Sequence, residues 1–242
     1  MGLQGKTAVI MGGATGFGAA IARALSKAGV RVMIADPDGL AAELLAQDLG
    51  GLWAQVDPAQ NNSLGAMAYK AADQIGDIDI LVNAHLPHSQ TKPLDEWTEA
   101  EFDATLSAQT KPLFLATRHF VPAMKARRSG TILSVTRPAK SQSSWPDAAQ
   151  GWAVAATKAM ALELAPFGIR VNALSLLADT SPVLPSFLSG KKNEDRGRKL
   201  AAIPLGRFAS VDDVSQAALF LCSDSASLIT GATIDIDGGA GL

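Results

Sequence analysis

A glycine-rich turn and an acidic residue near the start of the chain are the clearest candidates for ligand chemistry. The turn GGATGFG carries Gly12, Gly16 and Gly18, and it lies between an apolar run and the amphipathic segment AAIARALSKAG. Glycines with this spacing let the backbone of a strand–helix turn approach a pyrophosphate at a helix N-terminus. Asp36 ends the next apolar run, where a carboxylate can bind the ribose 2′-hydroxyl of NAD and repel the 2′-phosphate of NADP. The two features predict a dinucleotide site that prefers NAD.

The residues beside these features support the same preference. Thr15 and Pro37 stand where a basic residue would be needed to bind a 2′-phosphate, and both are neutral. Thr15 and Phe17 lie between the glycines of the turn, so we expect both to line the cofactor site. An ordinary strand–helix turn is the alternative for the glycine motif taken alone.

Three basic side chains farther along the chain are candidates for proton transfer or substrate binding. His85 follows an apolar run at the carboxyl end of an expected strand, and the ordinary pKa of histidine, about 6.5, suits acid–base chemistry at neutral pH. Lys158 lies in the segment AVAATKAM, where a helix is expected, and it could act as a base if burial lowers its pKa. Arg137 beside Lys158 would form a doubly cationic pocket that suits an anionic substrate group. A solvated loop position is the alternative for His85 and for Arg137.

Seven short apolar runs predict the strands that must position these residues. They span residues 7–11, 31–35, 52–56, 80–83, 131–135, 170–174 and 233–236. Each of the first six is followed by a segment with a helical pattern, and this alternation requires a parallel sheet with helices on both faces. We therefore expect an α/β fold with three layers: a doubly wound parallel sheet of about seven strands, in a single domain over residues 1–242.

Three segments in the second half of the chain carry further expectations. Residues 151–165 are apolar nearly all round, so this helix must bury more than the side that faces the sheet, which favours assembly of several copies. Residues 180–207 contain three prolines and the charged run KKNEDRGRK, which indicates either a substrate flap or a solvated loop. Ser210 and Asp213 form a capping-box pattern at the start of a helix.

Composition and charge exclude several classes of function. The formal net charge of −2 comes from an even scatter of both signs, so we expect no nucleic acid and no membrane surface as partner. No apolar run reaches the roughly 18 residues of a membrane span. The single cysteine, Cys222, lies in an apolar helical pattern, cannot form an intrachain disulfide, and fits a cytoplasmic protein. We expect no metal ion.

Over residues 6–239 the chain resembles the classical short-chain dehydrogenase/reductase family. Besides the glycine-rich turn, the resemblance rests on the letters FGIRVNALS, on Lys158, and on residues 203–239, IPLGRFASVDDVSQAALFLCSDSASLITGATIDIDGG, which are similar to the family almost residue for residue. The resemblance implies a Rossmann-type fold and hydride transfer between a nicotinamide cofactor, here NAD, and an alcohol or carbonyl carbon. It also implies a homotetramer, or at least a homodimer, built on the helix at 151–165 and on the last strand.

The resemblance assigns roles to further residues. Lys158 is the lysine of the family's Tyr-x-x-x-Lys motif and would bind the ribose hydroxyls of the cofactor. Asp57 would contact adenine, Asn83 would line the cofactor path, and Thr180 would contact the nicotinamide carboxamide. Gln109 stands in place of the family's helix asparagine, which orders a water against the lysine.

The proton-transfer end departs from the family pattern. Val154 stands where the family has the tyrosine that passes the proton, and the only tyrosine of the chain, Tyr69, lies in an early helix. The family's catalytic serine falls on Arg137 when counted from the preceding strand, and on Ser141 when counted back from Val154.

The expected nicotinamide pocket departs from the pattern as well. The family's Asn-Asn-Ala-Gly is replaced by the four residues from Asn83 to Leu86, so a bulky leucine stands in place of a glycine. The family's Pro-Gly after the sixth strand is replaced by Leu176 and Leu177. The adenosine half of the site therefore follows the family, whereas the nicotinamide half does not.

Three hypotheses for function follow. In the first, the protein is an NAD(H)-dependent oxidoreductase with an atypical active site, in which another group, such as His85, moves the proton. In the second, it binds NAD or nothing and serves as a non-catalytic partner in an oligomer. In the third, the fold carries non-redox chemistry such as dehalogenation. The intact NAD end favours the first, with a small substrate that is anionic, as Arg137 suggests, or aromatic, as Trp145 and Trp152 suggest.

Overall fold

The computed structural model describes residues 2–86, 92–137, 145–177, 197 and 200–242, and of residues 145–150 it describes the backbone alone. Ser141, Thr180 and most of the expected flap at 180–207 lie outside the described residues. The roles predicted for them stay predictions.

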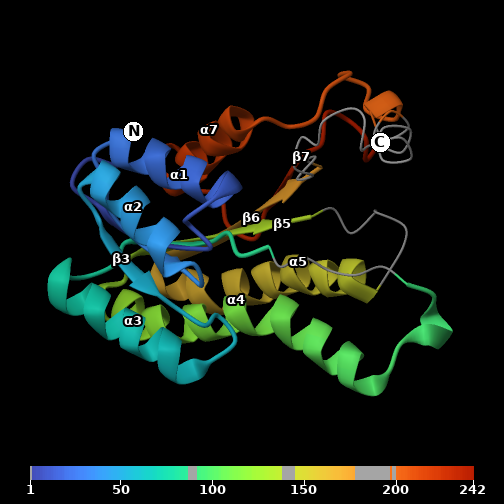
Figure 1. The fold of residues 1–242 in the computed structure, drawn as a ribbon. Helices are drawn as coiled ribbons and strands as arrows, with labels where there is room; N and C mark the ends of the chain where they lie inside the picture. Colours follow the sequence, from blue (N-terminus) through green and yellow to red (C-terminus); the bar gives the residue numbers. More distant parts are fainter. Residues whose placement is uncertain (1, 87–91, 138–144, 178–196, 198–199) are drawn as a thin grey trace.

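Seven parallel strands form one sheet at the centre of the molecule (Figure 1). In chain order they are β1 (Thr7–Met11), β2 (Arg31–Asp36), β3 (Leu52–Gln55), β4 (Ile80–Asn83), β5 (Gly130–Thr136), β6 (Ile169–Leu176) and β7 (Thr233–Ile236). Their order across the sheet is β3-β2-β1-β4-β5-β6-β7, and every pair of neighbours is parallel. The predicted doubly wound α/β fold is confirmed.

Helices cover both faces of the sheet (Figure 1). One face carries α1 (Gly16–Lys27), α2 (Gly39–Leu49) and α7 (Val211–Cys222), and the other carries α3 (Asn61–Gln74), α4 (Glu99–Arg127) and α5 (Trp145–Leu164). Short 3-10 helices lie at η1 (Leu94–Glu96), η2 (Ala165–Phe167) and η4 (Asp224–Ala226). α1 packs beside α7, and α4 packs beside both α3 and α5.

The side chains of the strands divide the core into two layers. In β1, Ala8 and Ile10 pack toward α1, α2 and α7, whereas Val9 and Met11 pack toward α3, α4 and α5. Successive side chains of a strand point to opposite faces of the sheet. A strand covered on both faces therefore needs apolar residues at consecutive positions, which explains the uninterrupted letters AVIM.

Several element bounds differ slightly from those predicted. β6 runs over Ile169–Leu176 rather than 170–174, because it pairs with β5 through Ser175 and with β7 through Leu176. β3 ends at Gln55, one residue before the predicted end. α5 begins at Trp145 rather than at 151.

Side-chain caps define where α2, α4 and α7 begin. Asp38 accepts a hydrogen bond from the backbone N–H of Ala41 at 3.0 Å, and Thr98 opens α4 with a capping box. The capping box predicted for Ser210 and Asp213 is confirmed at the start of α7. Among the described helices, none combines the length and the apolar character that crossing a membrane requires.

Candidate active site

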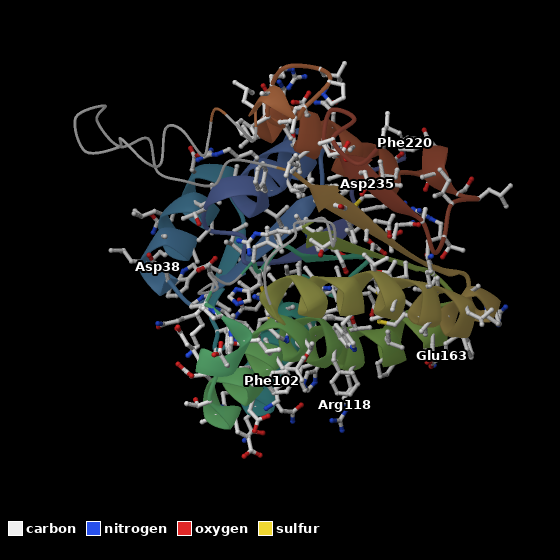
Figure 2. All side chains as sticks on the ribbon, turned by 90° about the vertical axis from the view of Figure 1, so that its right-hand side faces the viewer. Asp38, Phe102, Arg118, Glu163, Phe220 and Asp235 are labelled. Carbon is white, nitrogen blue, oxygen red and sulfur yellow. The ribbon has the colours of Figure 1, made fainter. Side chains whose placement is uncertain are left out.

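The carboxyl ends of β1 and β4 mark the point where the chain changes direction across the sheet. Strands are first added outward from β1 to β3, and the chain then returns to place β4 on the other side of β1. Met11 pairs with Ala35 of β2 and with Asn83 of β4, so the segments that follow these strands lie side by side. Open α/β sheets bind ligands at such switch points. In Figure 1 the arrowheads of β5 and β7 mark the carboxyl ends of these strands and point to the right-hand side of the molecule. The same side faces the viewer in Figure 2.

The glycine-rich turn leaves open space in front of α1. Gly16 has a φ of +55°, which residues with a Cβ rarely adopt, and a Cβ built there meets no atom within 4 Å. Gly18 holds the helix against the turn, because a Cβ there would lie 2.0 Å from the carbonyl oxygen of Gly12. The N-cap residue of α1, Thr15, makes no side-chain cap hydrogen bond, so the first N–H groups of α1 are available to an anion. This geometry fits a pyrophosphate.

Asp36 ties the glycine-rich turn to the end of β2. One carboxylate oxygen accepts a hydrogen bond from the backbone N–H of Ala14 at 3.1 Å, and the other accepts one from Asp38 at 3.0 Å. Each carboxylate oxygen has two acceptor positions, so the half-exposed group keeps capacity for ribose hydroxyls. The residues of the adenosine end therefore fit a dinucleotide.

Asp57 and Phe17 border the same region. Asp57 is exposed beyond β3, and its carboxylate accepts a hydrogen bond from the backbone N–H of Ala59 at 3.0 Å. Phe17 is half-buried and packs against the core layer below α1 and α7. Their cofactor contacts stay predictions, but both residues lie next to the elements that form the predicted site.

Asn83 is a buried polar residue at the end of β4. Its side-chain amide is buried, and within the part of the chain that the structure describes neither the amide nitrogen nor the amide oxygen has a hydrogen-bond partner. Its register partner on β5 is Ser134, whose buried hydroxyl also has no hydrogen-bond partner among the described residues. Because an unpaired buried polar group costs stability, this pair is a candidate for contact with a bound ligand.

Ser134 was not among the residues predicted from the sequence. The signal that could have found it is a single polar residue within the apolar letters TILSV. Neither sequence pattern nor spacing could pair it with Asn83, because β4 and β5 are separated by the whole of α4.

Val154 and Lys158 lie one helical turn apart on α5, as the spacing required. Val154 is half-buried, whereas Lys158 is exposed. The burial that the sequence hypothesis requires of Lys158 is therefore not found in the free chain. Gln109 on α4 and Arg137 just after β5 are both half-buried, and α4 packs against α5.

His85 lies beside the glycine-rich turn. A Cβ on Gly12 would lie 2.7 Å from the Cα and from the backbone nitrogen of His85. Burial lowers the pKa of the imidazole below its ordinary value, and the carboxylates of Asp36 and Asp57 act in the opposite direction. The structure thus groups His85 with the aspartates of the adenosine end.

The two bulky replacements near the expected nicotinamide pocket differ in burial. Leu86 is half-buried and packs against the core layer that also contacts Ala14 and Phe17. Leu176 is buried in that layer, so of the Leu176–Leu177 pair only Leu177 is half-exposed.

A cavity of about 440 Å³ lies at the opposite, amino-terminal edge of the sheet. Its charged lining is already paired, since Lys6 contacts Asp224 at 2.8 Å. Arg170 donates to the hydroxyl of Thr131 at 3.1 Å and to the carbonyl oxygen of Ser223 at 3.2 Å. The cavity is separate from the candidate active site.

Comparison with known proteins agrees with the fold. A family model described as enoyl-(acyl carrier protein) reductase matches residues 12–241. The 4-formylbenzenesulfonate dehydrogenase of Comamonas testosteroni is 34% identical over 256 residues, which cover 100% of both chains. The cis-4-hydroxycyclohexanecarboxylate dehydrogenase of Sinomonas cyclohexanicum is 32% identical over 97% of this chain and 96% of its own.

A solved structure shows the same similarity in three dimensions. The 3-ketoacyl-(acyl-carrier-protein) reductase from Brucella melitensis, crystallised in complex with NADH, is 34% identical and superimposes with a TM-score of 0.88 over 99% of this chain and 100% of its own. The fold and the switch-point site define a Rossmann-type α/β protein. The chain belongs to the short-chain dehydrogenase/reductase family of oxidoreductases.

Proposed function

We propose that the protein is an NAD(H)-dependent oxidoreductase that acts on an alcohol or carbonyl group with an atypical active site. The observation that carries the proposal is the adenosine end, where the backbone at Gly16 faces open space and Asp36, which is half-exposed, bonds to the same turn. The NADH complex of the Brucella melitensis reductase supports a nicotinamide cofactor. The carboxylate of Asp36 supports NAD over NADP, because a 2′-phosphate would meet a like charge.

The substrate that we propose is a cyclic alcohol or aldehyde with an anionic group. The names of two relatives describe substrates of this kind, a formylbenzenesulfonate and a hydroxycyclohexanecarboxylate. Arg137, at the end of β5, and Lys158, on α5, are cations on two neighbouring elements that could bind such a group.

Proton transfer is the step for which this chain lacks the family's residue. The nicotinamide ring, when bound, supplies or accepts the hydride. Val154 has no proton to give, and Tyr69 is exposed on α3, a helix that packs on α4. The proton must therefore pass through another side chain or through water, with His85 and Lys158 as the side chains predicted from the sequence.

Turnover of anionic and neutral substrates tests the proposal. With NAD and cis-4-hydroxycyclohexanecarboxylate, or with NADH and 4-formylbenzenesulfonate, we expect a slow change in NADH absorbance. With cyclohexanol or benzaldehyde the rate should be lower, because these neutral analogues lack the charge for Arg137. Loss of the difference in Arg137→Ala would support the assignment, and equal rates for charged and neutral substrates in the wild type would contradict it.

Restoring the missing acid separates an atypical enzyme from a non-catalytic protein. Val154→Tyr with Arg137→Ser should raise the reduction rate of simple ketones by about 10²–10⁴-fold, the usual contribution of a positioned general acid. The matched control, Val154→Phe with Arg137→Ser, has the same ring without the hydroxyl and should give no increase. A wild type that binds NAD but is inert toward every substrate would favour the second function, a non-catalytic NAD-binding partner.

The assembly and the location of the protein are part of the proposal as well. Leu162 on α5 is 82% exposed and Phe114 on α4 is 54% exposed, and large exposed apolar side chains on neighbouring helices favour contact with a second copy. A homotetramer or homodimer is the expected state. The buried Cys222 supports a cytoplasmic location.

A further inference from the structure

His85 lies at the edge of the sheet that is formed by the carboxyl ends of four neighbouring strands. The sheet order places β3, β2, β1 and β4 next to one another. The residues at or just beyond the ends of these strands are Asp57, Asp36, Gly12 and His85. Asp36 pairs with Gln55 at the end of β3, and Met11 pairs with Asn83 at the end of β4. The imidazole therefore shares one edge of the sheet with two carboxylates and the glycine-rich turn.

The backbone contacts hold this group in place. The backbone of His85 lies so close to Gly12 that any side chain on Gly12 would clash with it, and the preceding residue, Ala84, donates a hydrogen bond to the carbonyl oxygen of Met11 at 2.9 Å. Both aspartates are also fixed, because each accepts a backbone hydrogen bond. The family pattern has a small alanine at the position of His85, so its imidazole adds a titratable group that the resemblance does not predict.

We propose that His85 is a cofactor-binding residue of the adenosine-diphosphate pocket, and that it takes up a proton when a dinucleotide binds. The inference rests on the proposed NAD site, and it assigns His85 to the adenosine end instead of to proton transfer at the substrate.

The direction of the effect follows from the charges around the imidazole. In the free chain, burial lowers the pKa of His85, and Asp36 of β2 and Asp57 beyond β3 are the charged groups of the described chain that oppose this. A bound diphosphate adds negative charge nearby, and nearby negative charge raises the pKa of a histidine. Binding therefore favours the protonated form, so by linkage the affinity must rise as pH falls.

Calorimetric titration of the protein with ADP-ribose tests the inference without the nicotinamide ring. The diphosphate of ADP-ribose is a diester, so the charge of the ligand stays constant over the range that protonates histidine. Between about pH 8 and about pH 6 we expect the affinity of the wild type to rise roughly three- to tenfold. Titrations in two buffers with different ionisation enthalpies should show net proton uptake.

Two variants at the same position and one control make the result specific. His85→Ala and His85→Gln should abolish both the pH dependence and the proton uptake, and the glutamine variant keeps a polar side chain if the alanine variant folds poorly. His119→Ala is the control, because His119 lies on α4 and contacts Asn61 at the start of α3. It should behave like the wild type.

The outcomes separate this inference from the proposed function. Failure of the wild type to bind ADP-ribose at any pH would overturn both. Binding whose pH dependence is the same in His85→Ala would overturn the inference alone. Loss of turnover in His85→Ala with an unchanged pH dependence of ADP-ribose binding would assign the residue to proton transfer and would overturn the inference as well.

Discussion

At the scale of single residues, Asp36 contributes to the stability of the glycine-rich turn and, in the proposed function, to the choice of NAD over NADP. Its carboxylate accepts the backbone hydrogen bonds of Ala14 and Asp38. The same charge would face the 2′-phosphate of NADP. A substitution that keeps the shape and removes the charge tests the electrostatic contribution, although it also removes one of the two backbone hydrogen bonds.

We predict that Asp36→Asn raises the affinity for NADP relative to NAD by about tenfold, because it removes a like-charge contact while one amide oxygen can still accept a backbone hydrogen bond. Calorimetric titration with both cofactors at one salt concentration measures the ratio. Asp38→Asn is the matched control, since it removes a charge two residues away and asparagine is an equally good N-cap. An unchanged ratio in Asp36→Asn would show that the preference has another source.

Cys222 is a second residue whose chemistry is determined by burial. The thiol is fully buried on α7, and burial raises its pKa to about 12. Because the thiolate is the reactive form, we expect no reaction with a thiol reagent in the native protein and reaction of one thiol per chain after unfolding in denaturant. Rapid labelling of the native protein would contradict the buried position.

At the scale of elements, the capping box of α7 can be tested by removing the hydroxyl of Ser210. The hydroxyl of Ser210 accepts a hydrogen bond from the backbone N–H of Asp213 at 3.2 Å. Ser210→Ala should lower the free energy of unfolding by about 1 kcal/mol, the usual cost of losing such a cap. Denaturant unfolding measures the change, and Ser227→Ala, an exposed serine after η4, should have almost no effect.

The acid of the same capping box should make stability depend on pH. Hydrogen bonds from Arg207 and from Ser210, of which that from Arg207 has the largest effect, hold the pKa of Asp213 well below its ordinary value. A carboxyl group with a lower pKa in the folded state contributes stability above its unfolded pKa and loses it as pH falls. We expect Asp213→Asn to lower Tm at neutral pH and to leave it nearly equal to that of the wild type in strong acid. A difference in Tm that stays constant across this range would exclude the linkage.

At the scale of the whole molecule, the exposed apolar side chains of α4 and α5 are the surface that we expect to be covered by a second copy. Light scattering at micromolar concentration should show a tetramer or a dimer for the wild type. Leu162→Glu should reduce the assembly, because it places a charge in the contact. Leu44→Glu is the control, since Leu44 is also exposed but lies on α2. A monomeric wild type would refute the predicted assembly.

Much of the fold and of the glycine-rich turn could be predicted because the signals are local. Strands that are buried on both faces require short uninterrupted apolar runs, and the seven runs found in the sequence are the seven strands of the sheet. The spacing of Gly12, Gly16 and Gly18 follows from the geometry of one strand–helix turn. The presence of Val154 one helical turn before Lys158 is likewise a property of the sequence alone.

The environment of each side chain was decided only by the tertiary structure. Lys158 is exposed although its helix is apolar, and the carboxylates that act on the imidazole of His85 come from β2 and from beyond β3. Asn83 and Ser134 are register partners on neighbouring strands, and their polar groups are unpaired in the described chain, although α4 separates them in sequence. Local periodicity shows which residues share a face of one element, but burial and pKa depend on the elements packed against that face, which are distant in the chain.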